Sequence, residues 1–186
     1  MQPNFILELI STALGLLFLI ALIQKKVWAW PVGILSSLGS VVLFYRIQLY
    51  AETGLYLIYV LMGFYGWRMW SKAASNDGGL DQVPLIDYPW RKQRWGVLGL
   101  PVALALGSFL QQIPGVSFGY LDALTTVYAL IATWQETKRI RTAFHYWIPI
   151  NIATMLLYGF KGLWVYTGLM VIYSVMSVVG YLNWRK

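Results

Sequence analysis

Seven apolar segments, each about as long as a bilayer-spanning helix, make up most of this chain of 186 residues. Hydrophobic residues account for 59% of the chain and charged residues for only 11%, whereas a soluble domain has roughly 25% charged residues. The sequence therefore predicts an all-α integral membrane protein. The predicted spans are residues 5–23, 27–45, 54–70, 96–110, 120–135, 146–160 and 165–183.

The positive charges divide unevenly between the two sides that these spans define. Twelve of the 14 Lys and Arg residues fall on one side, and only Arg46 and Lys161 fall on the other. Cytoplasmic loops of membrane proteins carry such an excess, so we expect the amino terminus outside and the carboxyl terminus in the cytoplasm. The same placement in short loops argues against nucleic acid as a partner, despite the net charge of +7.

Metal, thiol and cofactor chemistry have little support in the composition. The chain has no cysteine and a single histidine, so thiolate ligands are excluded and a cluster of metal-binding residues is not expected. We find no converging set of catalytic side chains, which argues against an enzyme. A seven-helix sensor is the rival from another class, but the longest polar loop, residues 71–94, is short for an output domain.

An internal repeat relates the two halves of the chain. At a shift of 114 residues, GLYLIYVLMGFYGWRMW (54–70) aligns with GLMVIYSVMSVVGYLNW (168–184), and seven of the 17 pairs are identical. The same shift pairs Glu8 with Asp122 and Phe44 with Tyr158. Chance similarity between apolar helices is the alternative explanation.

Two three-helix repeats joined by one extra helix would have the same orientation in the membrane. We therefore expect three domains: a first repeat (1–70), a cytoplasmic loop with a linking fourth helix (71–118), and a second repeat (119–186). This 3+1+3 plan with parallel repeats resembles that of the sugar-transporting SWEET proteins, in which the substrate site lies between the halves.

The sixth predicted span has a polar and aromatic stripe on an otherwise apolar helix. Trp147, Asn151, Thr154 and Tyr158 recur at helical spacing. Polar groups within hydrocarbon are costly unless they meet protein, water or a ligand, so we interpret the stripe as one wall of a binding site. In the alternative interpretation, Asn151 and Thr154 bond to neighbouring helices and the aromatic residues pack.

The fifth predicted span offers a second wall. Asp122, Thr126 and Thr133 share one helix face, and Trp134 follows directly. Asp122 is either a helix-start carboxylate favoured by the helix dipole or an electrostatic partner of a cationic substrate. Trp67, at the end of the third span, is a further candidate for substrate contact, and a cation over such rings gains about 2 kcal/mol when dry.

Four motifs in combination resemble those of the PnuC family of bacterial vitamin transporters. They are YGWRMW (65–70), LDALTT (121–126), WIPIN (147–151) followed by Tyr158, and KGLW (161–164). The resemblance implies a facilitator of the bacterial inner membrane that takes up nicotinamide riboside, with a cytoplasmic kinase that traps the substrate by phosphorylation. It points to Trp147 and Asn151, and to the helix face of Thr126 and Thr133, as substrate contacts.

Two departures from the family pattern affect the expected substrate. Nicotinamide riboside transporters of this family typically have Gln where Thr133 stands, and Asn-Trp where this chain has Ala143-Phe144. Thiamine is therefore a close alternative substrate, and riboflavin or a deoxynucleoside is a further one. The sequence is also compatible with a homo-oligomer. Pro149 is expected near the start of its helix, where a missing N–H matters little.

Overall fold

The computed structural model describes residues 3–46, 50–76, 83–89, 93–113, 118–160 and 164–185. Over these residues it is helical, with seven α-helices and one short 3-10 helix, and this confirms the predicted helical class and helix number. The elements are α1 (Pro3–Ile23), α2 (Ala29–Arg46), α3 (Tyr50–Asn76), η1 (Arg94–Leu98), α5 (Gly99–Leu110), α6 (Gly119–Thr137), α7 (Ala143–Phe160) and α8 (Trp164–Arg185).

Helix boundaries differ from the prediction by up to six residues, and two of these differences matter for the site and the loop. The third helix continues to Asn76, six residues into the stretch expected to be a loop, since Ser71-Lys72-Ala73-Ala74 has no helix breaker. The sixth helix, α7, begins at Ala143, three residues earlier than expected, so Pro149 lies inside it. The expectation for Pro149 was therefore wrong, and its missing N–H leaves the carbonyl one turn earlier without its helical donor.

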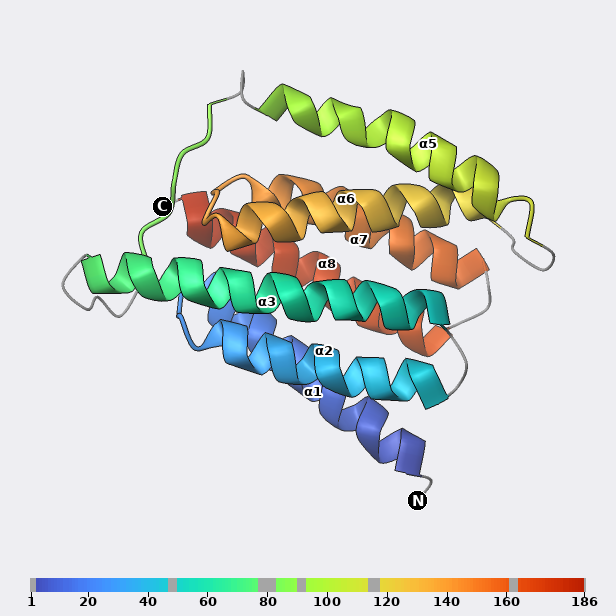
Figure 1. The fold of residues 1–186 in the computed structure, drawn as a ribbon, viewed down its shortest axis with the longest axis horizontal. Helices are drawn as coiled ribbons and strands as arrows, with labels where there is room; N and C mark the ends of the chain where they lie inside the picture. The colour runs from blue at the N-terminus through green and yellow to red at the C-terminus, as the bar shows by residue number, and fades with distance from the viewer. Residues whose placement is uncertain are drawn as a thin grey trace. The chain divides into compact units, whose positions relative to one another are not determined.

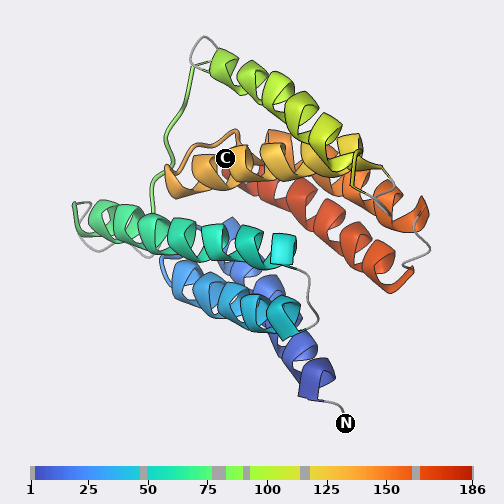
Figure 2. The same ribbon diagram turned by 45° about the vertical axis from the view of Figure 1, so that its right-hand side comes forward.

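The chain forms two compact units. The first comprises Met1–Leu85 with Thr137–Arg139, and the second comprises Ile86–Glu136 with Ile140–Lys186. In the first unit α2 packs against both α1 and α3; in the second, α7 and α8 lie side by side in both ribbon views (Figures 1 and 2). The predicted domain boundaries at 70/71 and 118/119 stay predictions.

The helices α1 and α6 end in the same backbone turn, at positions 114 residues apart. Lys25 and Arg139 both have a φ of 61°. The N–H after each donates back five residues, from Lys26 to Ala21 at 3.0 Å and from Ile140 to Gln135 at 2.9 Å. A left-handed residue followed by such a bond is the Schellman ending of a helix, and glycine is the residue that usually occupies the left-handed position.

A glycine and an aromatic ring pack together in each unit, again at positions 114 residues apart. A Cβ at Gly66 would lie 2.4 Å from the Trp30 ring, and a Cβ at Gly180 would lie 2.4 Å from the Phe144 ring. Trp30 meets Trp70 edge to face with centroids 5.6 Å apart, and Phe144 meets Trp184 likewise at 4.8 Å. The same arrangement of small and large residues therefore holds α2 to α3 and α7 to α8.

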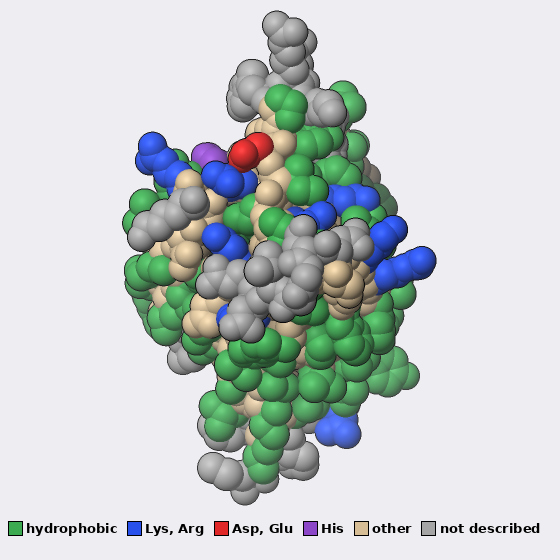
Figure 3. All heavy atoms as spheres, turned by 90° about the vertical axis from the view of Figure 1, so that its left-hand side faces the viewer, with side chains coloured by type: hydrophobic (Ala, Val, Ile, Leu, Met, Phe, Trp, Pro, Cys, Tyr) green, Lys and Arg blue, Asp and Glu red, His purple; other side chains and the backbone are tan. Residues whose placement is uncertain are grey.

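Many large hydrophobic side chains are exposed, as on a surface that meets lipid. Leu61, Val97 and Val175 are among more than thirty such residues, and green hydrophobic side chains predominate on the face in Figure 3. A soluble monomer rarely exposes large apolar patches. Three segments of the described helices are long and apolar enough to span a membrane, namely Ile6–Ile23, Ala29–Arg46 and Thr167–Arg185, and two more are shorter apolar helices.

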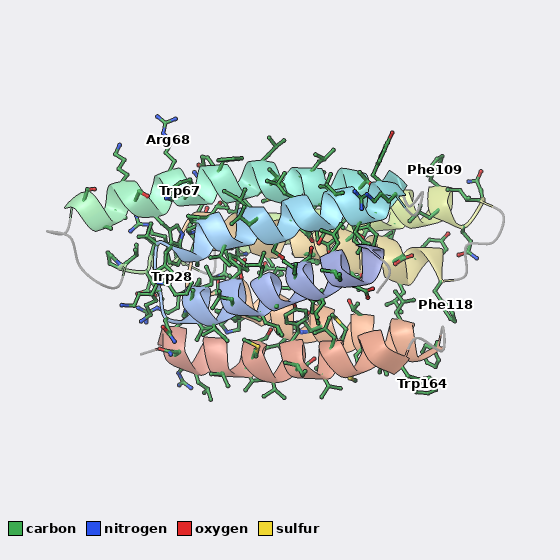
Figure 4. All side chains as sticks on the ribbon, turned by 90° about the horizontal axis from the view of Figure 1, so that it is seen from below. Trp28, Trp67, Arg68, Phe109, Phe118 and Trp164 are labelled. Carbon is green, nitrogen blue, oxygen red and sulfur yellow. The ribbon has the colours of Figure 1, made fainter. Side chains whose placement is uncertain are left out.

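Exposed aromatic residues gather at one end of the second unit. Phe109, Phe118 and Trp164 are labelled there in Figure 4, and each is more than 40% exposed. Phe118 stacks on Phe160, with ring centroids 5.7 Å apart. Aromatic rings concentrate where a membrane protein meets the bilayer–water boundary, so this end of the unit suits that boundary.

Candidate functional site

Trp147 begins the α7 stripe and packs against α6. Its ring packs on a small apolar cluster formed by Ala129, Ala132 and Ile150. The alanines of α6 leave room for the indole, which is partly exposed. The ring is therefore fixed along one side and has surface left for a flat ligand.

Asn151 lies one turn further along and is directed toward α8. Its Nδ2 donates to Ser177 Oγ at 2.8 Å and, more weakly, to the Tyr173 carbonyl at 3.4 Å. The side chain is 8% exposed. Trp147 contacts α6 and Asn151 contacts α8, so these two residues of the stripe lie along the seam where α7 meets both helices.

These hydrogen bonds join α7 to α8, as the alternative interpretation of the stripe expected. Among the described residues, both hydrogen bonds of Asn151 use Nδ2. The amide oxygen remains the atom that a substrate hydroxyl or amide could reach. A role in substrate binding therefore stays a prediction, with Oδ1 as the acceptor.

The predicted α6 residues are held in different ways. Thr133 is 9% exposed, and its hydroxyl donates to the Ala129 carbonyl at 2.8 Å. Asp122 stands in the first turn of α6, where its N–H donates to the Phe118 carbonyl at 3.0 Å. This position suits a carboxylate favoured by the helix dipole, and Thr126 lies one turn later, half-buried.

The remaining predicted site residues fall in different surroundings. Trp134 and Thr154 are half-buried, in α6 and α7 respectively. Tyr158 is in α7, but its side chain lies outside the part of the chain that the structure describes. Trp67 belongs to the first unit, on α3 (Figure 4), and is 41% exposed.

Phe144, one of the two departures from the family pattern, is in the helix packing of the second unit. It is fully buried between Gly180 and Trp184. Its counterpart Trp30 has an indole N–H that is buried without a hydrogen-bond acceptor among the described residues. A phenyl ring at 144 introduces no such unsatisfied donor, so packing gives this departure a physical reason.

Sequence reasoning missed two buried polar residues at the end of α6, Gln135 and Glu136. Each is only 2% exposed. Gln135 Oε1 accepts a hydrogen bond from the Thr142 hydroxyl at 3.1 Å. The available signal was the helical pattern itself, which places residue 136 on a buried face of α6.

An open pocket lies next to these residues in the second unit. It is lined by Gln93, Thr142, His145 and Tyr146, with a volume of about 240 Å³. His145 is exposed and meets the Tyr181 ring edge to face at 4.9 Å. Within the described residues, no group of three or more His, Cys, Asp or Glu side chains could hold a metal ion.

Long apolar helices with exposed hydrophobic faces define a class, that of multi-helix membrane proteins. A family model described as nicotinamide mononucleotide transporter matches residues 5–186. The chain therefore belongs to this family, whose curated members include the PnuC transporters.

Individual relatives agree with this assignment. The nicotinamide riboside transporter PnuC of Neisseria mucosa is 24% identical over 196 residues, covering 100% of this chain and 74% of the relative. The riboflavin/roseoflavin transporter RibM of Streptomyces davaonensis is 23% identical, covering 95% of this chain and 83% of the relative. A crystal structure of the vitamin B3 transporter PnuC has the same fold, with a TM-score of 0.75 at 24% identity, over 99% of this chain and 82% of that one.

Proposed function

We propose that this chain takes up nicotinamide riboside across the bacterial inner membrane by facilitated diffusion. The observation that carries the proposal is the α7 stripe, in which the partly exposed Trp147 ring and the Asn151 amide lie one turn apart along the seam with α6 and α8. A flat cationic ring can stack on the indole, and ring amide or ribose groups can donate to Asn151 Oδ1. Relatives named as nicotinamide riboside transporters support this substrate.

The transport cycle follows from the repeat. The matched helix endings at Lys25 and Arg139 and the matched packing of Gly66 and Gly180 support two equivalent three-helix units. In the 3+1+3, SWEET-like plan these units are parallel and rock around a midplane site. The amino terminus is outside and the carboxyl terminus is cytoplasmic, as the Lys and Arg distribution favours. A cytoplasmic kinase then retains the substrate by phosphorylation.

Thiamine and riboflavin are the alternative substrates of a transporter with the same fold and site. Thiamine is also a flat cation, and Thr133 stands where the resemblance leads us to expect Gln. Riboflavin is favoured by the similarity to RibM. In both alternatives the α7 stripe still binds the substrate, and only the ring system of the substrate differs.

Calorimetry on the purified protein separates these possibilities. Nicotinamide riboside, thiamine and riboflavin are titrated side by side into the same preparation. We expect nicotinamide riboside to bind at least about tenfold more tightly than the others, a difference of about 1.4 kcal/mol. Selective binding of thiamine or riboflavin would move the assignment to that vitamin, and binding of none would overturn the proposal.

A further inference from the structure

Among the residues that the structure describes, the chain passes from one compact unit to the other at three places. These crossings run from Leu85 to Ile86, from Glu136 to Thr137 and from Arg139 to Ile140. The last two are three residues apart, in the turn that joins α6 to α7. Any movement of one unit against the other has to bend the chain at these crossings, because covalent bonds join the units there.

Backbone and side-chain contacts bring the three crossings together. In the second unit, Ile86 and Ile140 form a parallel β-bridge, and the Ile140 N–H donates to the Gln135 carbonyl at 2.9 Å. In the first unit, the Arg139 guanidinium donates from Nη1 to the Pro84 carbonyl at 3.0 Å. The crossings therefore form one structural feature, which these five residues define and which we call the crossing point.

The chain on each side of the crossing point is anchored within its own unit. In the first unit, the Val83 N–H donates to the Lys25 carbonyl at 3.0 Å, and Val83 is only 1% exposed. In the second unit, the Arg141 N–H donates to the Ile86 carbonyl at 3.2 Å, and Arg141 Nε lies 3.1 Å from an Asp87 carboxylate oxygen. Because both sides are held, bending is concentrated in the few bonds between them, as in hinges made of a few loop residues.

The crossing point lies at one end of the helices in each unit. In the first unit it adjoins Lys25, which follows α1 and precedes α2, and in the second unit it lies between α6 and α7. The helices α2 and α6 have 18 and 19 residues, so their other ends are about 27 Å further along. A rotation about one end of a helix displaces its other end most.

We propose that the crossing point is the hinge of the transport cycle, so that the units pivot at this end and move most at the opposite end. The proposal rests on the proposed function, which requires the units to rock. In the predicted orientation this hinge is cytoplasmic, because Lys138, Arg139 and Arg141 belong to the positively charged side. The larger opening is then on the outer side, where the substrate enters.

Pairs of spin labels test this placement, because the chain has no native cysteine that would react with the label. Gln24→Cys with Asn183→Cys places labels near the ends of α1 and α8 that adjoin the crossing point. Arg46→Cys with Gln112→Cys places them near the remote ends of α2 and α5, and all four positions are exposed. Distances are measured by double electron–electron resonance in lipid nanodiscs, with and without nicotinamide riboside. The remote pair should shift by several ångströms, and the pair near the hinge by less than half as much.

Each other result overturns a distinct statement. Equal shifts of both pairs, or a larger shift of the pair near the crossing point, would overturn this hinge. If neither pair shifts in protein that binds nicotinamide riboside by calorimetry, the rocking movement is overturned together with the hinge. Failure to bind the vitamin would overturn the proposed function, and the inference with it.

A disulfide at the hinge is a second test. The two chains of a β-bridge place paired Cα atoms at a distance that a disulfide can span, so Ile86→Cys with Ile140→Cys should oxidise readily. A hinge stays together throughout the cycle, so uptake into vesicles should remain within about twofold of that of the reduced protein. The single-cysteine variants are matched controls for the oxidant. A loss of uptake that reductant reverses would show that the two segments must separate, and failure to form the disulfide would contradict their pairing; either result overturns the hinge.

Discussion

The α1–α3 helices and the α6–α8 helices use the same backbone devices but place different chemistry on them. Each set of three helices has a residue in the left-handed backbone conformation after its first helix. Each set also has a glycine in its last helix that packs against an aromatic ring of the middle helix. The first unit fills the buried end of its first helix with Ala21 and Leu22, and the second unit fills it with Gln135 and Glu136. The shared features are those that hold the helices together, and the buried polar pair is found in the unit for which we propose the substrate site.

The largest expected effect comes from the paired glycines. Gly66→Ala and Gly180→Ala each place a Cβ 2.4 Å from a ring that is almost fully buried. Both should destabilise the protein by about 2 kcal/mol, because the ring has no space to move into. Thermal melting of the purified protein measures this effect.

The chain provides a matched control for these two variants. Gly54 and Gly168 are also paired by the repeat, and no described atom lies within 4 Å of a Cβ built there. Alanine at either position should leave the melting temperature unchanged or slightly raised. Marked destabilisation by Gly66→Ala but not by Gly180→Ala would show that the two units are not held together in the same way.

Asn151 is the next point of comparison, because the repeat pairs it with Ser37 of the first unit. Asn151→Ala should reduce uptake by about tenfold, since it removes the proposed acceptor for the substrate, and tenfold corresponds to about 1.4 kcal/mol. Ser37→Ala should leave uptake unchanged. The measurement is accumulation of labelled substrate in cells with matched expression.

Ser177→Ala separates binding from packing at the same place. It removes the 2.8 Å bond to Asn151 Nδ2 but keeps the amide oxygen. Uptake should stay within about twofold of wild type if that oxygen accepts from the substrate. A loss as large as that of Asn151→Ala would assign Asn151 to helix packing alone.

The aromatic residue that packs on each glycine can be replaced by the residue type found at the paired position of the other unit. Trp30→Phe should be nearly neutral, because it loses some buried area but also removes an N–H that is buried without an acceptor among the described residues. Phe144→Trp should destabilise by about 1 kcal/mol, because it adds volume and an N–H to a fully buried position. Melting temperatures of both variants check this, and an equal loss in both would refute the explanation given for Phe144.

Hydropathy and spacing predicted much of this architecture, because apolar segments of fixed length and a 114-residue register are properties of the sequence itself. They also placed Trp147 and Asn151 on one helix face. They allowed a bond from Asn151 to a neighbouring helix but did not identify Ser177 as its partner, since contacts between helices depend on tertiary packing. Glu136 was missed because it follows the predicted span by one residue, next to a basic loop where acids are usually solvated.

The left-handed turns provide the smallest and most discriminating comparison. Lys25 and Arg139 both have a φ of 61°, which costs a non-glycine residue roughly 1 kcal/mol. Lys25→Gly relieves this cost and keeps the bond from Val83 N–H to the carbonyl of residue 25, which is a backbone atom. It should therefore stabilise the protein by up to about 1 kcal/mol, seen as a higher melting temperature.

Arg139→Gly should gain less from the same relief. The Arg139 guanidinium donates from Nη1 to the Pro84 carbonyl at 3.0 Å, and glycine loses that bond. Its loss should offset most of the gain, leaving a change near zero. Equal stabilisation by both variants would show that the Pro84 contact contributes nothing, and destabilisation by Lys25→Gly would contradict the assignment of strain to these turns.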